Sequence, residues 1–353
     1  MNCPALPSTF FAQTLVAWQR QHGRHELPWQ GTREPYRIWV SEIMLQQTQV
    51  GTVIPFYQRF MTAFPKVIDL ARADLETVLG HWSGLGYYAR GRHLHRAAQK
   101  IVQQGFFPRS SEELQKLPGV GRSTAAAIAV FAYGQRAAIL DGNVKRVLGR
   151  FFALDTPEDA GLWALAESLL PDRELETYTQ GLMDMGSLLC TRTRPRCAVC
   201  PLQTQCQAYL RGETQRYPTA RRKTVRSERH HRLLLLCTPD GRWLMEKRPI
   251  PGVWGGLWSF PMEVSDSRPA GHSLTLDLAP YPELDLPPFI HRLTHFDWHL
   301  TPCAFKVGGA VPSPSDTPGH WKSLSDLMTH PLPTPIRQLL HTLSTKQTGH
   351  CVE

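Results

Sequence analysis

The chain has 353 residues, about twice the usual length of one domain, so two or three domains with hydrophobic cores are expected. Its 42% apolar and 20% charged residues exclude a disulfide-held mini-protein and a wholly disordered chain. The net charge of +9 lies entirely in residues 1–228, which carry 28 basic and 19 acidic side chains, whereas residues 229–353 carry 11 of each. The N-terminal part is therefore the candidate for binding a polyanion such as nucleic acid.

Targeting signals are not apparent. No stretch reaches the roughly 18 consecutive apolar residues that span a bilayer, and the first residues lack the basic and apolar regions of a signal peptide. We expect a monomer that has no membrane partner and is not exported. The absence of a transit sequence makes the cytoplasm of a bacterium, at the nucleoid, the expected location. Eight cysteines are too few for a disulfide scaffold, so a cluster of them indicates metal.

Helical periodicity dominates the first two hundred residues. Residues 39–49 form an expected helix that contains Glu42, and apolar residues recur at helical spacing over 94–102, where Gly105 ends the helix. Ser110 and Glu113 have the form of a capping box for a short helix. These signals predict an all-α region.

Two further helices are expected beyond Pro118. An alanine-rich helix runs to about Gly134. Val144, Val147, Leu148 and Phe151 then form one apolar face, with Lys145, Arg146 and Arg150 at other positions around the helix.

The pattern changes after Tyr217. Residues 217–228 are polar and basic without periodicity, which predicts a linker. Residues 233–236 are a short apolar run, a Pro-Asp-Gly turn follows, and residues 242–247 alternate between polar and apolar, which together predict a β-hairpin. Residues 336–343 predict a closing helix. We therefore expect a helical region over 1–216 and a second, strand-rich domain over 229–353.

Four cysteines stand as C-x6-C-x2-C-x5-C, at Cys190, Cys197, Cys200 and Cys206. Four thiolates this close can hold one zinc ion or one iron–sulfur cluster, and buried unliganded thiols are the alternative. The spacing resembles the iron–sulfur loop, residues 190–206 here, of the endonuclease III and MutY family of DNA glycosylases. That resemblance implies one [4Fe-4S] cluster. Three arginines between the first two cysteines would then stabilise the cluster or contact DNA phosphates: Arg192, Arg194 and Arg196.

A Leu-Pro-Gly-Val-Gly segment contains Gly119 and Gly121, whose missing side chains allow close backbone approach. The helix that starts near Arg122 offers N–H groups to an anion, although a plain helix–helix turn is the commoner use of such glycines. The segment resembles the helix-hairpin-helix of the same family, which grips a DNA phosphate. Relatives that also cut the strand place a lysine where this chain has Ser123, so base removal without strand cleavage is expected.

Two carboxylates are candidates for catalysis. Asp141 precedes an amphipathic helix, where an aspartate is most often an N-cap. By resemblance it is the family's essential aspartate, which stabilises an oxocarbenium-like sugar. Glu42 lies among apolar neighbours in a string that resembles the MutY signature, and this implies a general acid whose pKa is raised by burial. A surface glutamate is the ordinary alternative.

The resemblance also assigns residues that contact DNA. Gln47 and Tyr87 would fill the space left by a flipped base, and Trp29 matches a position near the target base. A surface amide and core aromatic residues are the ordinary alternatives.

The C-terminal part resembles the MutT-like (Nudix-fold) domain of the family, notably over residues 252–261, but lacks a Nudix box. We therefore expect lesion recognition and no second active site there. Leu293, Thr294 and His295 match the family's Phe-Ser-His loop, which contacts 8-oxoguanine. His295 and a hydroxyl are kept, but Leu293 loses an aromatic contact.

The expected fold is multidomain: an all-α helix-hairpin-helix glycosylase domain with an iron–sulfur loop, followed by an α+β MutT-like domain. The expected activity is removal of adenine from double-stranded DNA where it is mispaired with 8-oxoguanine or guanine. One alternative is a bifunctional, endonuclease III-like glycosylase for damaged pyrimidines, which Ser123 and the second domain disfavour. The other alternative is a non-catalytic iron–sulfur DNA-binding protein, which leaves Glu42 and Asp141 without a role.

Overall fold

The computed structural model describes residues 8–155, 159–219, 225–264, 277–281, 284–308 and 319–348. The chain divides into two compact units. Unit 1 consists of Met1–Arg72 and His93–Arg222, and unit 2 consists of Ala73–Arg92 and Lys223–Glu353. Unit 2 therefore combines a short stretch of the helical region with the C-terminal sheet.

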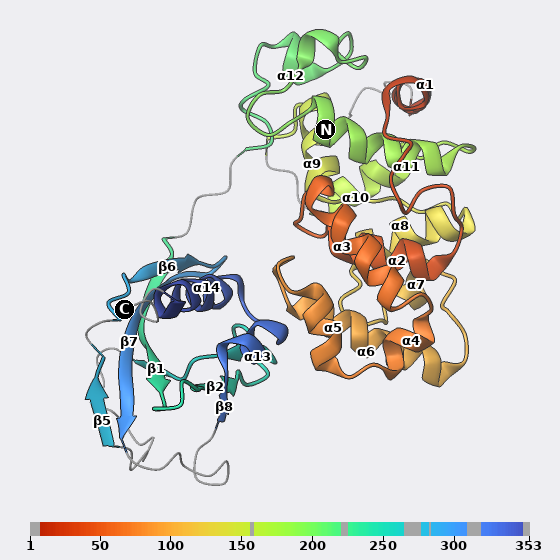
Figure 1. Ribbon diagram of the computed structural model, residues 1–353. Helices are drawn as coiled ribbons and strands as arrows, with labels where there is room; N and C mark the ends of the chain where they lie inside the picture. Colours follow the sequence, from red (N-terminus) through yellow and green to blue (C-terminus); the bar gives the residue numbers. More distant parts are fainter. Residues whose placement is uncertain are drawn as a thin grey trace. The chain divides into compact units, whose positions relative to one another are not determined.

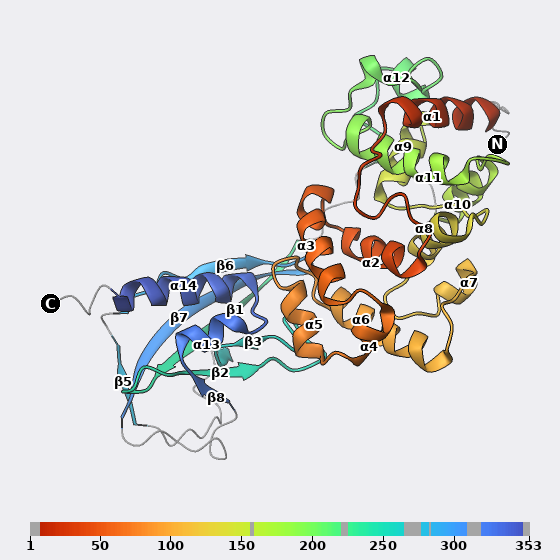
Figure 2. The same cartoon turned by 45° about the vertical axis from the view of Figure 1, so that its right-hand side comes forward.

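Unit 1 is helical, as the periodicity predicts (Figures 1 and 2). Its helices are α1 (Ser8–His22), α2 (Pro35–Leu45), α3 (Val50–Ala63), α4 (Val67–Arg72), most of α6 (Ala89–Gln104), α7 (Ser111–Leu114), α8 (Arg122–Tyr133), α9 (Gly142–Phe151), α10 (Asp159–Ser168), α11 (Leu175–Asp184) and α12 (Gln207–Leu210). A π-helical turn (Met185–Leu189) and a 3-10 turn (Cys197–Val199) lead into the cysteine loop.

The local signals for helix ends act as expected. Ser110 and Glu113 form the complete capping box of α7. Gly105 and Gly134 end α6 and α8 with φ of 80° and 64°, a left-handed backbone that favours glycine. The helix ends are therefore fixed by residues next to them in the chain.

One hydrophobic core of unit 1 is built from α1, α8, α9, α10 and α11. The predicted apolar face of α9 is buried. Arg150, which lies outside the predicted apolar face, is nevertheless buried, since only 3% of it is exposed. Backbone carbonyls of the cysteine loop accept its N–H groups, which is how a buried guanidinium is tolerated.

Unit 2 contains a mixed sheet. Its elements are α5 (Leu75–Trp82), β1 (Ser227–Cys237), β2 (Trp243–Lys247), β3 (Trp258–Ser259), β4 (Met262–Val264), β5 (Asp277–Pro280), β6 (Phe289–Arg292), β7 (Phe296–Gly308), β8 (His320–Lys322), α13 (Leu324–Thr329) and α14 (Thr334–Thr348). The predicted hairpin is the antiparallel pair β1–β2, and the closing helix is the longer α14. Strand β1 begins inside the predicted linker, whose residues 220–224 lie outside the described residues.

The centre of the sheet is the parallel pair β1–β7, which runs in register from Ser227 beside Phe296 to Cys237 beside Lys306. Strand β6 pairs with β7 in the antiparallel sense, and a tight turn connects the two strands. Helix α14 lies against one face of this sheet (Figures 1 and 2) and buries Ile336, Leu340 and Leu343.

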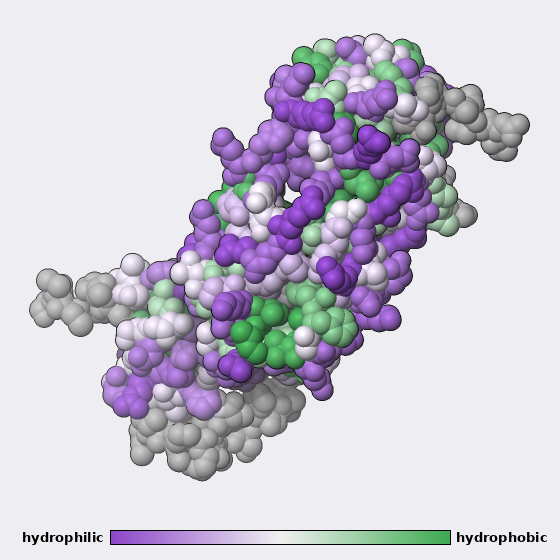
Figure 3. Space-filling view, turned by 90° about the vertical axis from the view of Figure 1, so that its right-hand side faces the viewer, coloured by the Kyte–Doolittle hydropathy of each residue, from purple (hydrophilic) through white to green (hydrophobic). Residues whose placement is uncertain are grey.

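No helix in the described ranges is long and apolar enough to cross a membrane. Hydrophilic residues predominate on the face in Figure 3, where apolar residues gather in separate patches.

Glu76 on α5 is held by residues of the C-terminal part of unit 2. Its carboxylate accepts hydrogen bonds from Trp258 Nε1 at 2.6 Å and from His330 Nδ1 at 2.8 Å, and Lys247 Nζ lies 2.6 Å away. Burial alone would raise the pKa of Glu76, but these hydrogen bonds and the Lys247 charge outweigh it and lower the pKa. Ser83 Oγ adds a bond to the Leu332 carbonyl at 2.9 Å.

We predict that Glu76→Gln destabilises unit 2 at neutral pH by about 1–2 kcal/mol, because the neutral amide loses the ionic contact and one acceptor. A carboxylate with a lowered folded pKa stabilises above its unfolded pKa of about 4.3, and this contribution disappears as the pH falls through the folded pKa. Denaturant melts at pH 7 and pH 3 measure both effects. Glu112→Gln, at an exposed glutamate of α7, is the control. An equal deficit at both pH values would contradict an ionic role for Glu76.

Candidate active site and cysteine loop

Glu42 lies on α2 and lines a cavity of about 290 Å³ in unit 1. The predicted Trp29 lines the same cavity and packs edge-to-face on Tyr57, with ring centroids 5.3 Å apart. The other lining residues include Gln19, Arg24, His25, Gln30, Ser41, Phe131, Thr177, Gln180 and Met183. The cavity thus combines aromatic and polar surface with the carboxyl groups of Glu42 and Glu176, as a binding pocket for a flat polar ring allows.

The environment of Glu42 favours the protonated carboxyl. Burial raises its pKa, and the nearby Asp141 carboxylate raises it further, to about 8. Glu42 therefore carries a proton at neutral pH. A carboxyl with this pKa beside an ionised carboxylate is the arrangement used by a general acid and its partner.

Asp141 is the N-cap of α9. Its carboxylate accepts hydrogen bonds from Asn143 N at 3.0 Å and from Val144 N at 2.8 Å. The helix end therefore fixes and stabilises the negative charge. Ser123 is placed next to it in the fold, because Ser123 Oγ accepts a hydrogen bond from Leu140 N at 3.0 Å. Asp141 therefore both caps α9 and acts electrostatically on Glu42.

The predicted hairpin lies between α7 and α8. Gly119 has φ of 79°, and a Cβ there would lie 2.8 Å from His93 Cβ, so both conformation and space require glycine. Gly121 is the N-cap of α8, whose first N–H groups have no partner within the helix. Gln46 Nε2 supports the turn by donating to the Gly119 carbonyl at 3.3 Å.

Gln47 and Tyr87 both adopt an uncommon backbone conformation. Their φ values are 57° and 49°, in the left-handed region that side chains other than glycine rarely adopt. Half of Tyr87 is exposed, and Gln47 is exposed at the end of α2. Such strain is typical of functional positions. The two residues belong to different units.

The four cysteines Cys190, Cys197, Cys200 and Cys206 line one cavity of about 30 Å³. Burial raises the pKa values of three of these thiols, and that of Cys200 reaches about 12. Four thiols around one space favour a bound metal group, because a metal binds the thiolate form and offsets the cost of burying that charge. The donor set therefore fits a cluster with four thiolate ligands.

Arg150 organises the cysteine loop. Its guanidinium donates to the carbonyls of Thr191 at 2.6 Å and Arg192 at 3.0 Å, and Nη1 lies 3.4 Å from Cys190 Sγ. Such hydrogen bonds tune thiolate ligands. The predicted Arg192, Arg194 and Arg196 are all exposed on this loop and so are available to an anionic partner.

Leu293, Thr294 and His295 form the turn between β6 and β7. Leu293 N donates to the Phe296 carbonyl at 3.0 Å and closes the turn. Thr294 and His295 are exposed, whereas Leu293 is partly buried. The two polar side chains are therefore accessible to a ligand.

Sequence reasoning missed the residues that position the Glu42 cavity. Arg24 binds the fully buried Asp184 carboxylate through its backbone N at 2.8 Å and its Nε at 2.7 Å. Gln30 bonds the Arg24 carbonyl at 2.9 Å, which fixes the loop that contains Trp29. No local signal identifies this set, because Arg24 and Asp184 are far apart in the chain.

Comparison with known proteins identifies both parts of the chain. Residues 40–171 match the HhH-GPD superfamily of base excision DNA repair proteins, and residues 232–342 match the NUDIX domain. Among solved structures, a thermostable thymine-DNA glycosylase is similar with a TM-score of 0.54 and 28% identity, over 58% of this chain and 97% of that one.

The chain is also similar over its length to curated proteins. The adenine DNA glycosylase of Buchnera aphidicola subsp. Baizongia pistaciae is 33% identical over 345 residues, covering 96% of this chain and 98% of the relative. That of Mus musculus is 46% identical over 219 residues, covering 58% of this chain and 42% of the mouse protein. The chain belongs to the MutY-type adenine DNA glycosylase family. It is an enzyme of base excision repair that hydrolyses the N-glycosidic bond of adenine in DNA.

We predict that Glu42→Gln makes the protein more stable than the parent at alkaline pH. The unfolded chain ionises Glu42 near pH 4.3 and the folded chain near pH 8, so between these values folding retains a proton that the unfolded state has lost. Parental stability therefore falls across this range, by up to about 1.4 kcal/mol per pH unit, and the glutamine variant lacks that loss.

Thermal melts of both proteins from pH 5 to pH 8 measure the effect. The variant should gain on the parent steadily as the pH rises, whereas Glu112→Gln should follow the parent. A constant difference between variant and parent would show that the pKa of Glu42 is not raised.

Proposed function

We propose that this enzyme is a monofunctional glycosylase that removes adenine mispaired with 8-oxoguanine or guanine. One observation carries the proposal: Glu42 lines a cavity with Trp29 and has a pKa of about 8 beside Asp141. A protonated carboxyl in a pocket is what a purine leaving group needs, because adenine departs readily only when it is protonated.

The two carboxyl groups would act in sequence. Glu42 donates its proton to the base as the N-glycosidic bond breaks, and Asp141 stabilises the positive charge that develops on the sugar. Two backbone N–H groups hold the Asp141 carboxylate in place at the start of α9. Water then attacks the sugar cation, and the proton it releases returns to the Glu42 carboxylate. Ser123 offers a hydroxyl where a Schiff base requires an amine, so no strand cleavage accompanies base removal.

The DNA would be held by backbone and stacking contacts. Gly119 and Gly121 bring the N-terminus of α8 to a phosphate, and the exposed arginines of the cysteine loop add positive charge. Gln47 and Tyr87 project from strained, exposed positions suited to replacing a flipped base. Trp29 would contact the adenine in the cavity.

The turn between β6 and β7 would recognise the base opposite adenine. Thr294 and His295 are exposed hydrogen-bonding groups, and their pairing with a purine edge would distinguish 8-oxoguanine. Leu293 offers apolar contact only. In this proposal the catalytic region over 1–216 and the recognition domain over 229–353 act in one monomer.

The cysteine loop would hold a [4Fe-4S] cluster through Cys190, Cys197, Cys200 and Cys206. The lining of one cavity by all four thiols supports this assignment, as does the Arg150 guanidinium near Cys190 Sγ. The cluster would fix the basic loop in place and take no part in bond cleavage.

The activity is tested with end-labelled duplexes that carry adenine opposite 8-oxoguanine, guanine or thymine. We expect breaks at adenine opposite 8-oxoguanine and guanine, and only after hot alkali opens the abasic site. Glu42→Gln should bind these duplexes as the parent does but turn over at least about 100-fold more slowly.

Glu112→Gln should retain parental turnover. Breaks without alkali would contradict the role given to Ser123, and parental turnover by Glu42→Gln would contradict the general acid. Binding without base removal by the parental protein would favour the non-catalytic alternative.

The cluster is tested by metal analysis of the anaerobically purified protein. About four iron atoms and four sulfides per chain are expected. Cys200→Ser should lose most of this iron, since it removes one ligand. Cys303→Ser, at a partly buried cysteine of β7, should retain it. One zinc ion and no iron would identify the alternative occupant.

A further inference from the structure

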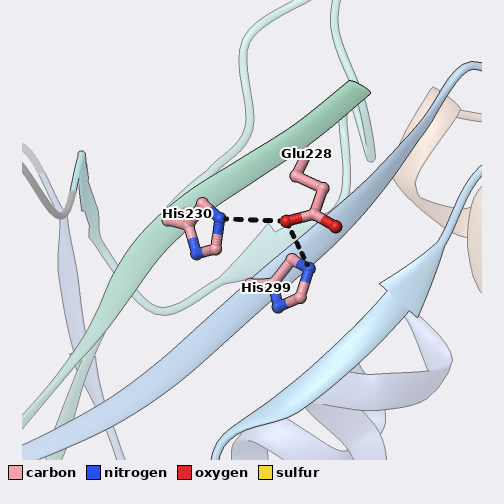
Figure 4. Close-up of side chains that lie close together, drawn as sticks. All are labelled: Glu228, His230 and His299. Atoms are coloured by element: carbon pink, nitrogen blue, oxygen red, sulfur yellow. Dashed lines mark ion pairs between the residues drawn. The ribbon is translucent and has the colours of Figure 1, made fainter. Parts of the chain in front are cut away.

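Three potential metal ligands converge on the sheet of unit 2, in a different unit from the cysteine loop. Glu228 and His230 lie on β1, and His299 lies on the adjacent β7 (Figure 4). One ligand atom from each lies within 4.8 Å of the other two. Two imidazoles and a carboxylate form a donor set that suits zinc and similar divalent ions.

The strand pairing explains why these side chains meet. Residues two apart on a strand point to the same face, so Glu228 and His230 share a face of β1. In the parallel register His230 lies directly beside His299. The three donors are therefore placed by rigid backbone, and no flexible loop has to order on binding.

The separations suit a shared ion better than direct hydrogen bonds. Glu228 Oε2 lies 3.6 Å from Nε2 of His230 and 3.6 Å from Nε2 of His299. Good hydrogen bonds of this type are about 2.7–3.2 Å long. Two ligands bound tetrahedrally at about 2.0–2.1 Å from zinc lie roughly 3.3–3.4 Å apart. The two rings are stacked, with centroids 4.4 Å apart, so binding of a shared ion would require them to rotate about their χ angles until both nitrogens face it.

The surrounding charges permit a cation. Arg232 pairs with Glu263 at 3.1 Å and Arg226 pairs with Asp297 at 3.1 Å. Arg229, which alternates to the other face of β1 from Glu228 and His230, lies over the Phe296 ring, 4.1 Å from its centroid. Glu228 is bonded to none of these arginines among the ion pairs of the described residues. Its negative charge is therefore directed to the histidines.

We propose that Glu228, His230 and His299 bind one divalent transition-metal ion, with zinc the best match. Three protein ligands leave a coordination position for water or for an anionic oxygen. The ion would join the start of β1 to β7. Its ligand on β7, His299, follows the exposed Thr294 and His295 by a few residues. Metal binding would thus stiffen the strands that support the proposed recognition turn.

The probe is zinc itself, added to untagged, full-length protein whose iron content has been measured. Equilibrium dialysis near neutral pH followed by elemental analysis gives zinc bound per chain. We expect the parent to bind one zinc more than the double variant His230→Gln/His299→Gln. Glu228→Gln should weaken this binding at least about tenfold, because even the loss of a group behind a ligand costs that much.

His341→Gln, at an exposed histidine of α14, is the matched control and should bind zinc as the parent does. The cysteine loop is the same in all variants, so any zinc bound there cancels in the comparison. Glu228→Gln removes only a charge from an exposed side chain, which keeps the test valid if the double variant does not fold. Equal zinc binding by the parent and Glu228→Gln would overturn the proposal. This outcome is independent of glycosylase activity.

Discussion

The proposed active site depends on the burial of one carboxyl group near a second that is held at a helix N-terminus. Glu42 is enclosed by α2 and its neighbours, where water stabilises an anion poorly, so the pKa rises to about 8. Asp141 experiences the opposite environment, because two N–H groups at the start of α9 bind its carboxylate. The helices of unit 1 therefore give two chemically similar groups different surroundings, which is what the proposed general-acid mechanism requires.

A second constraint is that backbone carbonyls of the cysteine loop need hydrogen-bond donors. The loop contains little regular structure, and the carbonyls of Thr191 and Arg192 accept from a side chain. Arg150 supplies several N–H groups from the side of α9, and the helix that follows Asp141 thereby also supports the loop. The carboxylate at the start of α9 and the cysteine loop near its end are in this way fixed by one rigid element.

Unit 2 combines the C-terminal sheet with a segment of the helical region. Glu76 on α5 accepts hydrogen bonds from Trp258 and His330, and Ser83 donates to the Leu332 carbonyl. The segment that follows contains Tyr87. Tyr87 therefore shares a compact unit with the turn that contains Thr294 and His295, although more than two hundred residues separate them in sequence.

The sequence by itself determined the all-α character of the first region, the helices near 94–104, 122–133 and 142–151, the caps at Ser110 and Gly134, the β1–β2 hairpin and the family, because these depend on neighbouring residues and on short motifs. Capping by Asp141 and the turn at Gly119 are examples, since each needs only its own chain segment. The helix expected over 39–49 ends at Leu45 instead, and Gln47 adopts a left-handed backbone. Tertiary structure decided the cavity around Glu42, the burial of Arg150, the pairing of Arg24 with Asp184 and the meeting of Glu228 with His299. These depend on groups brought together from distant segments, and burial and charge, which set a pKa, exist only once the chain has folded.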